Sequence, residues 1–171
     1  MPPTLPPPRD PASDTYTVAL VCLGNICRSP IAHVVLERKL SSMSTPRQVV
    51  VESSGTGDWH IGEPMDPRAA DTLTAAGYNA SLHRARQVDP ELFSRNDVIL
   101  VMDQSNLTDV RALAPGGIDR DRVMMFRAFD PLLGDDLDVP DPWSGGQQGF
   151  DEVLAIVERT TDTLVEALTG V

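Results

Sequence analysis

Cysteine, long apolar runs and positive charge are all scarce in this sequence of 171 residues. It has only two cysteines, Cys22 and Cys27, and they lie five residues apart, so the pair could form a disulfide, hold a metal or supply a reactive thiol. No apolar run approaches the length that spans a bilayer. Prolines stand where a secretory signal has its apolar stretch, so we expect a cytoplasmic protein with reduced thiols. Secretion by a route that needs no signal stays open.

Positive charge is outnumbered by negative charge. Lysine and arginine total 14 against 25 aspartates and glutamates, which gives a formal net charge of −11. Such a field repels nucleic acid and anionic lipid, and no basic stripe stands out against it. We therefore expect neither nucleic acid nor a membrane as a partner, and we expect a monomer.

The N-terminus differs in composition from the rest. Residues 1–14, "MPPTLPPPRDPASD", are rich in proline, so we expect a disordered or polyproline-like tail. A docking motif for an aromatic-lined module is the functional alternative for this tail. Residues 15–171 have the ordinary globular mixture and a length that suits one domain with a full core.

From residue 15 onward, short apolar runs alternate with amphipathic segments. Strands are expected at 16–24, 48–55, 96–103 and 121–126, and helices at 29–40, 65–77, 104–114 and 149–168. Ser29 is placed as the N-cap of the first helix, with Pro30 at its first position, and Gly77 ends the second helix. Strands that alternate with helices predict a single three-layer α/β domain whose parallel sheet is covered on both faces.

The stretch "VCLGNICRSP" follows the first predicted strand, at the edge of the sheet where functional groups gather. Gly24 and Asn25 tolerate the positive φ angles of a tight cradle, and the next helix points its N–H groups at the cradle's centre. Arg28 can hold two phosphate oxygens at once. The same field favours Cys22 as a thiolate, which predicts phosphoryl transfer through a cysteinyl-phosphate.

Structural, metal-binding and nucleotide-binding roles fit Cys22 and its loop less well. A purely structural cysteine rarely occupies such an electropositive turn. A zinc site needs a C-x-x-C pair or a second pair of ligands, and the sequence has neither. The Gly-rich nucleotide loop closes with Gly-Lys-Ser/Thr, which is also missing. We expect no metal and no cofactor.

The same stretch resembles the signature of the low-molecular-weight protein tyrosine phosphatases of the bacterial type, and the resemblance runs from about Tyr16 to Leu168. It implies a four-stranded parallel sheet in the order 2-1-3-4, with Cys22 as nucleophile and Arg28 as the phosphate-binding arginine. Ser29 would hydrogen-bond the thiolate, and side-chain hydrogen bonds would hold Asn25 in a strained conformation. The implied phosphate-binding loop comprises Leu23, Gly24, Asn25, Ile26, Cys27, Arg28 and Ser29.

An aryl phosphate needs an acid for its leaving oxygen and later a base for water. Asp141, held between two prolines in "VPDPWSGG", can serve as both, and the family's Asp-Pro-aromatic loop matches this position. The resemblance also assigns supporting roles to Ser53, His83 and Asp103. An equally good interpretation of Asp103 is a helix N-cap, and a lone histidine is more often structural.

Trp59 and Trp143 both fall on predicted loops at the strand ends. Core packing is the default for tryptophan, but both match family positions that form the walls of a phosphotyrosine slot. His33 and His60 lack any such context, so we expect both on the surface. The family often has two tyrosines after its Asp-Pro pair, and Trp143 and Ser144 stand there instead.

Two other functions compete with the phosphatase interpretation, an arsenate reductase on the same scaffold and a phosphopeptide-binding module. An arsenate reductase would need resolving cysteines late in the chain, and none follows Cys27, although an external thiol could substitute. A phosphopeptide-binding module would lack Cys22 or Asp141, and both are present.

For a phosphatase, the implied partners are tyrosine-phosphorylated proteins, such as a bacterial tyrosine kinase, polysaccharide-export machinery or host proteins. Two interpretations of Cys27 stay open. It is either an apolar filler beneath the loop or a thiol that protects a redox-sensitive Cys22 by forming a disulfide with it.

Overall fold

A computed structural model describes residues 2–132 and 134–171 of the chain, so Met1 and Leu133 lie outside the described residues. One parallel sheet has the strand order β2-β1-β3-β4, which confirms the predicted topology. Its strands are β1 (Thr15–Cys22), β2 (Gln48–Gly55), β3 (Val98–Val101) and β4 (Val123–Met125). Apolar residues dominate the central strands β1 and β3, as is typical of strands buried on both faces, whereas the edge strand β2 is buried only over its last three residues.

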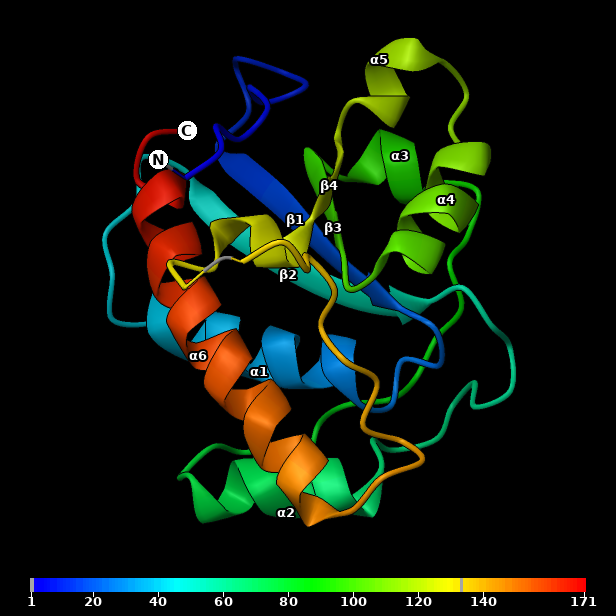
Figure 1. Cartoon of the computed structure of the whole chain (residues 1–171). Helices are drawn as coiled ribbons and strands as arrows, with labels where there is room; N and C mark the ends of the chain where they lie inside the picture. Colours follow the sequence, from blue (N-terminus) through cyan, green and yellow to red (C-terminus); the bar gives the residue numbers. More distant parts are fainter. Residues whose placement is uncertain (1, 133) are drawn as a thin grey trace.

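Helices cover both faces of the sheet, which confirms the three-layer α/β architecture. They are α1 (Arg28–Leu40), α2 (Pro67–Ala75), α3 (Leu92–Arg95), α4 (Gln104–Ala112), α5 (Gly117–Arg120), the 3-10 helix η1 (Phe126–Phe129) and α6 (Gln147–Leu168). Helices α1 and α6 lie side by side on one face, with α2 beyond them, and α3 and α4 lie on the other (Figure 1). No helix among the described residues is both long enough and apolar enough to cross a membrane.

Alternate residues of β1 belong to two separate cores. Leu20 and Cys22 pack with the cluster beneath α1 and α6, whereas Ala19 and Val21 pack with the cluster beneath α3 and α4. This alternation follows from the period of two along a strand. It puts the sulfur of Cys22 on the α1 side of the sheet, toward the helix that carries Arg28.

The strands end close together at their carboxyl edge. Cys22 pairs in register with Gly55 of β2, and Val21 pairs with Val101 of β3. The loops that follow these strands therefore start from neighbouring points, where residues distant in sequence can meet.

Several local predictions were wrong. Helix α1 starts at Arg28 with Cys27 at its N-cap position, and no side chain caps it, so Ser29 is not the N-cap. The prediction failed because the Ser29 hydroxyl bonds to loop side chains instead. Helices α3, α5 and η1 were not predicted, because elements of four residues are too short to show a period.

The N-terminal segment also differs from its prediction. Residues 2–14 form no helix or strand, but they lie against the domain instead of forming a free tail. Leu5 is only 5% exposed and belongs to the main core, and the hydroxyl of Tyr16 donates to the carbonyl of Pro6 at 2.7 Å. Proline reduces the entropy that the segment loses on ordering, so a few contacts suffice to hold it.

Candidate active site

The loop that joins β1 to α1 is held by one asparagine. Asn25 has a φ of 56°, the one positive value at a non-glycine position in the described part of the chain. A positive φ was also expected at Gly24, and Gly24 does not have one. The Asn25 Nδ2 donates to Ser29 Oγ at 2.8 Å and to Ser53 Oγ at 3.2 Å. Its Oδ1 accepts from the main-chain N–H of Arg86 at 2.9 Å. These bonds hold a left-handed conformation that few residues other than glycine tolerate.

Gly55, which the sequence analysis missed, makes room for this loop. A Cβ at Gly55 would lie 2.6 Å from the carbonyl oxygen of Leu23 and 3.0 Å from the nitrogen of Asn25. The loop therefore folds against bare main chain at the end of β2. The sequence signal was present as a glycine that ends a predicted strand, where a close backbone approach is common.

Cys22 lies at the base of the loop and is only 2% exposed. Its Sγ is 3.0 Å from Ser29 Oγ, and the main-chain N–H of Asn25 donates to it at 3.3 Å. The side-chain Nδ2 of Asn25 can only donate to Ser29, so the Ser29 hydroxyl can direct its own hydrogen to the sulfur at 3.0 Å, which is closer than its other acceptor, the carbonyl of Ser54 at 3.5 Å. Two donors thus face Cys22, an arrangement that stabilises negative charge on sulfur.

Arg28 brings a buried positive charge beside that sulfur. Its Nη1 donates to Asp103 Oδ2 at 2.6 Å and to the carbonyl of Val139 at 3.1 Å, and its Nη2 lies 3.6 Å from Asp141 Oδ2. Burial by itself would lower the pKa of the Arg28 guanidinium, but Cys22 and the two carboxylates outweigh burial and raise it. The guanidinium therefore stays charged at the base of the site.

Asp103 fits both interpretations that the sequence left open. One oxygen accepts from the N–H of Asn106 at 2.7 Å and caps α4, while the other accepts from Arg28. Asp103 therefore fixes the guanidinium to the start of α4, which itself begins at the carboxyl edge of the sheet.

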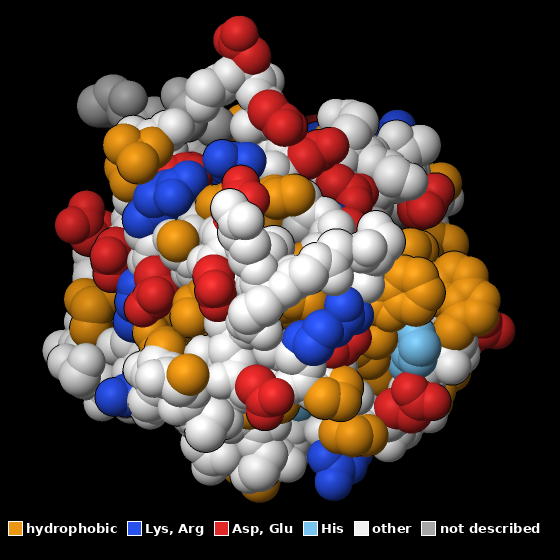
Figure 2. Space-filling model, turned by 60° about the horizontal axis from the view of Figure 1, so that its bottom comes forward, with side chains coloured by type: hydrophobic (Ala, Val, Ile, Leu, Met, Phe, Trp, Pro, Cys, Tyr) orange, Lys and Arg blue, Asp and Glu red, His pale blue; other side chains and the backbone are white. Residues whose placement is uncertain are grey.

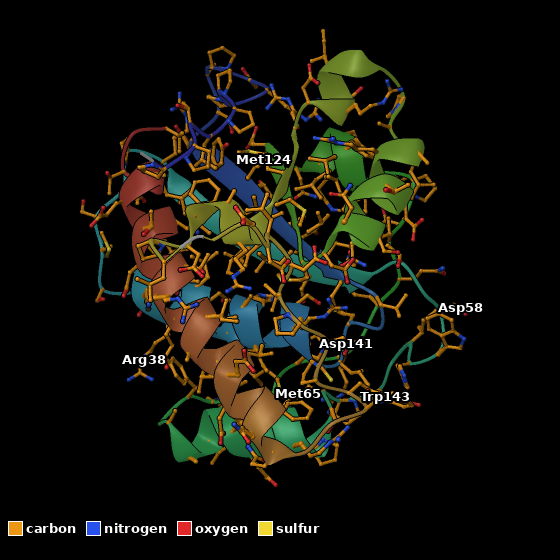
Figure 3. The ribbon with its side chains drawn as sticks, in the orientation of Figure 1. Arg38, Asp58, Met65, Met124, Asp141 and Trp143 are labelled. Atoms are coloured by element: carbon orange, nitrogen blue, oxygen red, sulfur yellow. The ribbon has the colours of Figure 1, made fainter. Side chains whose placement is uncertain are left out.

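Asp141 lies on the loop that leads into α6, where Figure 3 shows it on the same loop as Trp143. It is exposed, and its Oδ1 accepts from the N–H of Trp143 at 3.1 Å. The structure thus brings Asp141 to the mouth of the site that Cys22 and Arg28 occupy at the base.

A second arginine, also missed from the sequence, holds this loop in place. Arg68 of α2 donates to the carbonyls of Trp143 and Gly145 at 2.9 and 3.0 Å, and its guanidinium stacks 4.7 Å from the ring centre of Phe150. It also pairs with Asp66, the N-cap of α2. In the sequence, Arg68 belongs to "MDPR", a pattern that indicates the start of a helix and gives no sign of a contact with the loop of Asp141.

Two histidines support the loop from behind. His83 Nε2 lies 2.7 Å from the carbonyl of Asn25, and His33 Nδ1 lies 3.0 Å from Ser53 Oγ. His33 also pairs with Glu37 one helical turn away. Burial lowers the pKa of both His33 and His83.

His33 and His60, expected on the surface, both keep part of the side chain exposed, 22% and 29%. Each is half-buried. His33 sits inside the support network because α1 turns that face toward β2, and His60 lines the mouth of the site, paired with Glu63 at 2.9 Å.

These residues surround a cavity of about 410 Å³. Its lining comprises Cys22, Leu23, Gly24, Ile26, Cys27, Arg28, Trp59, His60, Asp141 and Trp143. Trp59 and Trp143 stand at the mouth, 64% and 58% exposed. Figure 2 shows hydrophobic side chains gathered beside a histidine at one edge of the face turned forward. The cavity is thus a slot with apolar walls, a charged base and a carboxylate at its rim.

The second cysteine lies in the same loop. Cys27 is buried, and both thiols are free. Burial, together with Asp66 and then Cys22 and Asp141, raises the pKa of the Cys27 thiol to about 12. Cys27 therefore carries its proton at neutral pH.

The arrangement suits a tetrahedral oxyanion held over a sulfur nucleophile. No side chain caps α1, which leaves the N–H groups of its first turn available to an anion, and Arg28 adds a planar pair of donors. Among residues 2–132 and 134–171, no group of three or more His, Cys, Asp or Glu side chains is placed to hold a metal ion.

Comparison with known proteins agrees with this geometry. The sequence profile of a family described as low molecular weight phosphotyrosine protein phosphatase matches residues 17–170. A low molecular weight protein-tyrosine-phosphatase of Streptomyces coelicolor is 43% identical over 155 residues, which cover 90% of this chain and 94% of the relative. Low molecular weight protein-tyrosine phosphatase A of Mycobacterium bovis is 42% identical over 147 residues, 85% of this chain and 87% of the relative.

A solved structure is similar over the same span. The crystal structure of a protein tyrosine phosphatase from Entamoeba histolytica, with Hepes in its active site, superposes with a TM-score of 0.84 at 28% identity. The match covers 91% of this chain and 97% of that one. By sequence and by fold, the chain belongs to the family of low-molecular-weight protein-tyrosine-phosphatases.

Proposed function

We propose that the chain hydrolyses phosphotyrosine in proteins through a phosphate ester formed on Cys22. The observation that carries the proposal is the meeting of Cys22, Arg28 and Asp141 at one cavity with tryptophan walls. A nucleophile, a phosphate-binding cation and a proton donor are the three groups that this reaction needs.

In the first step, the Cys22 thiolate attacks phosphorus, and the bond between phosphorus and the tyrosyl oxygen breaks. Asp141 gives its proton to that oxygen, so tyrosine leaves as a neutral phenol. Arg28 and the N–H groups of the loop hold the other phosphate oxygens while charge builds on them.

In the second step, a water molecule attacks the phosphorus of cysteinyl-phosphate. The Asp141 carboxylate takes a proton from this water, and the bond between sulfur and phosphorus breaks. Inorganic phosphate leaves, and the Ser29 hydroxyl stabilises the returning thiolate, as its 3.0 Å distance from the sulfur allows. Ser53 and His83 support this geometry through Asn25.

The depth of the slot favours an aryl phosphate. Cys22 lies buried at its base, whereas Trp59 and Trp143 stand exposed at its mouth. A phosphotyrosine ring spans that depth and packs between the two indoles, but the shorter side chain of phosphoserine does not. The Entamoeba relative binds Hepes, a sulfonate, in its active site, and a sulfonate has the tetrahedral oxygens of a phosphate.

The decisive experiment measures phosphate release from p-nitrophenyl phosphate and from a phosphotyrosine peptide. We expect turnover by the wild type, none by Cys22→Ser, and a loss of about 10²–10³-fold for Arg28→Lys, because an ammonium cannot bind two oxygens in plane. Cys27→Ser is the matched cysteine control and should keep its turnover. Cys22→Ser activity within roughly tenfold of the wild type would remove Cys22 from the mechanism.

The same preparation should be assayed for arsenate reduction with an external thiol. Arsenate reduction without phosphate release would favour the reductase and would overturn the phosphatase proposal. We propose tyrosine-phosphorylated proteins as partners, which an Asp141→Ala variant should trap because it slows turnover and leaves the binding groups in place. A bacterial tyrosine kinase, polysaccharide-export machinery and host proteins remain the predicted sources, and the cytoplasmic location remains a prediction.

A further inference from the structure

A second hollow, which we call the flanking groove, lies beside the active-site cavity. It measures about 350 Å³, and its lining includes Leu23, Gly57, Trp59, Asp109, Ala112 and Leu113. Leu23 and Trp59 also line the active-site cavity, so the two hollows share a wall. A ligand bound in the active-site cavity therefore lies directly beside the flanking groove.

Gly57 sets the position of that shared wall. A Cβ at Gly57 would lie 2.0 Å from a ring carbon of Trp59, so the indole packs directly against bare main chain. The amide of Gly57 also donates to the carbonyl of Leu23 at 2.8 Å, which ties this turn to the phosphate-binding loop. The indole is thereby held as a partition between slot and groove.

The opposite wall of the groove is the C-terminal end of α4. Asp109, Ala112 and Leu113 lie on one face of this helix end, three and four residues apart, and all three are exposed. Leu113 is 59% exposed. Asp109 forms no ion pair with any residue that the structure describes, so its charge is available. The groove therefore combines apolar walls with one unpaired negative charge.

This combination fits a side chain with an aliphatic stem and a cationic end. The stem of a lysine or arginine can pack against Leu113 and the indole of Trp59, while its charge approaches Asp109. The net charge of −11 also attracts basic peptides to the molecule as a whole. An acidic side chain in the same place would meet repulsion from Asp109.

We propose that the flanking groove binds a lysine or arginine next to the phosphotyrosine of a protein substrate and selects basic sequences. The inference rests on the proposed function, because the phosphotyrosine must occupy the slot. One indole separates the two hollows, and an extended peptide advances about 3.3–3.6 Å per residue, so the basic residue lies one or two positions from the phosphotyrosine.

The test compares phosphotyrosine peptides that carry lysine, norleucine, glycine or glutamate at each position from −2 to +2. At one position, we expect kcat/KM to be roughly fivefold or more higher for lysine than for glutamate, with norleucine between them. In Asp109→Asn the ratio should fall below about twofold, and added salt should lower the wild-type ratio. Leu113→Ser should weaken the lysine and norleucine peptides relative to glycine.

Turnover of p-nitrophenyl phosphate should not change in either variant, because that substrate is too small to reach the groove. Asp71→Asn, an exposed aspartate on α2, is the matched control and should keep the lysine preference. A ratio that survives Asp109→Asn, or wild-type rates that are equal for all peptides, would overturn the groove proposal and leave the phosphatase proposal standing. Occupation by a second copy, seen as self-association that Leu113→Ser abolishes, would overturn it as well.

Failure of the proposed function gives a different result, namely no turnover of p-nitrophenyl phosphate by the wild type. The groove proposal stays testable even then through peptide binding to Cys22→Ser. The dissociation constants should follow the same order, with lysine tightest and glutamate weakest, and a flat order would overturn the proposal.

Discussion

The guanidinium of Arg68 on α2 donates to the carbonyl oxygen of Trp143, 2.9 Å away in the loop that carries Asp141. The same guanidinium bonds to Gly145 and to Asp66, and the main-chain N–H of Asp66 donates to the carbonyl of Ile26 at 2.9 Å. One arginine thus links the loop of the proposed proton donor to the phosphate-binding loop, although more than 70 residues separate Arg68 from Trp143.

Replacing Arg68 by alanine should therefore misplace Asp141 without removing it. We expect kcat for phenyl phosphate, a substrate with a poor leaving group, to fall about 10-fold, and kcat for p-nitrophenyl phosphate to fall less. Arg38→Ala is the matched control, since Arg38 also stacks on an aromatic ring, 5.3 Å from the centre of Tyr78. Figure 3 shows Arg38 well apart from Asp141 and Trp143. Equal losses on both substrates would contradict the positioning role.

The Asp141→Asn variant tests the proton donor itself. Without a proton to give, the enzyme should lose about 10²–10³-fold in kcat on phenyl phosphate and least on substrates whose phenols are most acidic. The measurement is kcat against the pKa of the leaving phenol, which should slope steeply in the variant and weakly in the wild type. A uniform loss across the series would show that Asp141 only positions its loop.

Peroxide should inactivate the wild type reversibly and Cys27→Ser largely irreversibly. Peroxide oxidises the Cys22 thiolate to a sulfenic acid. Cys27 then gives up its proton and attacks that sulfur as the thiolate. The sulfenic hydroxyl takes up a proton and leaves as water, a Cys22–Cys27 disulfide forms, and dithiothreitol afterwards restores both thiols. Recovery of activity after dithiothreitol is the readout, with mass spectrometry of the disulfide-linked peptide. The hypothesis fails if both proteins recover equally and no linked peptide is found.

Acidification below about pH 6.5 should lower the free energy of unfolding. Burial lowers the pKa of His33 and His83 in the folded state, so the unfolded state binds more protons within this window. The stability gained by burying these two histidines in the neutral form is present above their pKa in the unfolded state. It is lost as the pH falls toward their lower pKa in the folded state. Urea unfolding at pH 7.5 and 5.5 measures this loss, and a His33→Gln, His83→Gln double variant should lose less.

The lowered pKa of Asp66 and Asp130 acts only at more acidic pH, because carboxyl groups titrate there. An equal loss in wild type and variant would rule out these histidines as the cause.

The N-terminal segment should contribute to stability and not to catalysis. Leu5→Ser should cost about 2 kcal/mol of the free energy of unfolding, because a leucine in the main core would give way to a polar side chain. Leu132→Ser, at a leucine 71% exposed, should cost little. A deletion of residues 2–12 should lower Tm further, since Arg9 also donates to Asp97 at 2.7 Å and pairs with Asp119.

Turnover of p-nitrophenyl phosphate by this truncated chain should match that of the full chain, because the segment lies away from the cavity. An unchanged Tm would show that the segment adds no stability, as expected of the disordered tail that its composition predicts. A loss of turnover in a folded truncation would give the segment a catalytic role.

The sequence by itself determined the secondary structure wherever the pattern was long or strongly marked. Strand β2 spans the predicted residues 48–55, and α6 buries Phe150, Val153 and Val157 as its period requires. Gly77 ends the second helix with a φ of 89°. Hydrophobic period and glycine freedom are local properties, so they can be predicted without the fold.

The residues at the base of the site could also be predicted from the local sequence. Cys22, Arg28 and Ser29 lie within one turn and its helix, so their spacing in the sequence predicts that they meet. The four-residue helices and the docking of the N-terminal segment could not be predicted in the same way. Both depend on distant contacts, such as the hydroxyl of Tyr16 on the carbonyl of Pro6.

Only the tertiary structure decided which distant residues complete the site. Parallel strands place their carboxyl ends at one edge, and this brings Asp103, after β3, against Arg28. The loop between η1 and α6 passes that edge, where the N–H of Val139 donates to the carbonyl of Met102 at 2.7 Å, and this brings Asp141 to the mouth of the cavity. Arg68, Gly55 and His33 have ordinary local contexts, and each acquires its role through contacts with residues distant in sequence. A sequence shows which side chains can make such a contact, but packing decides which of them do, because the contact exists only where two surfaces meet.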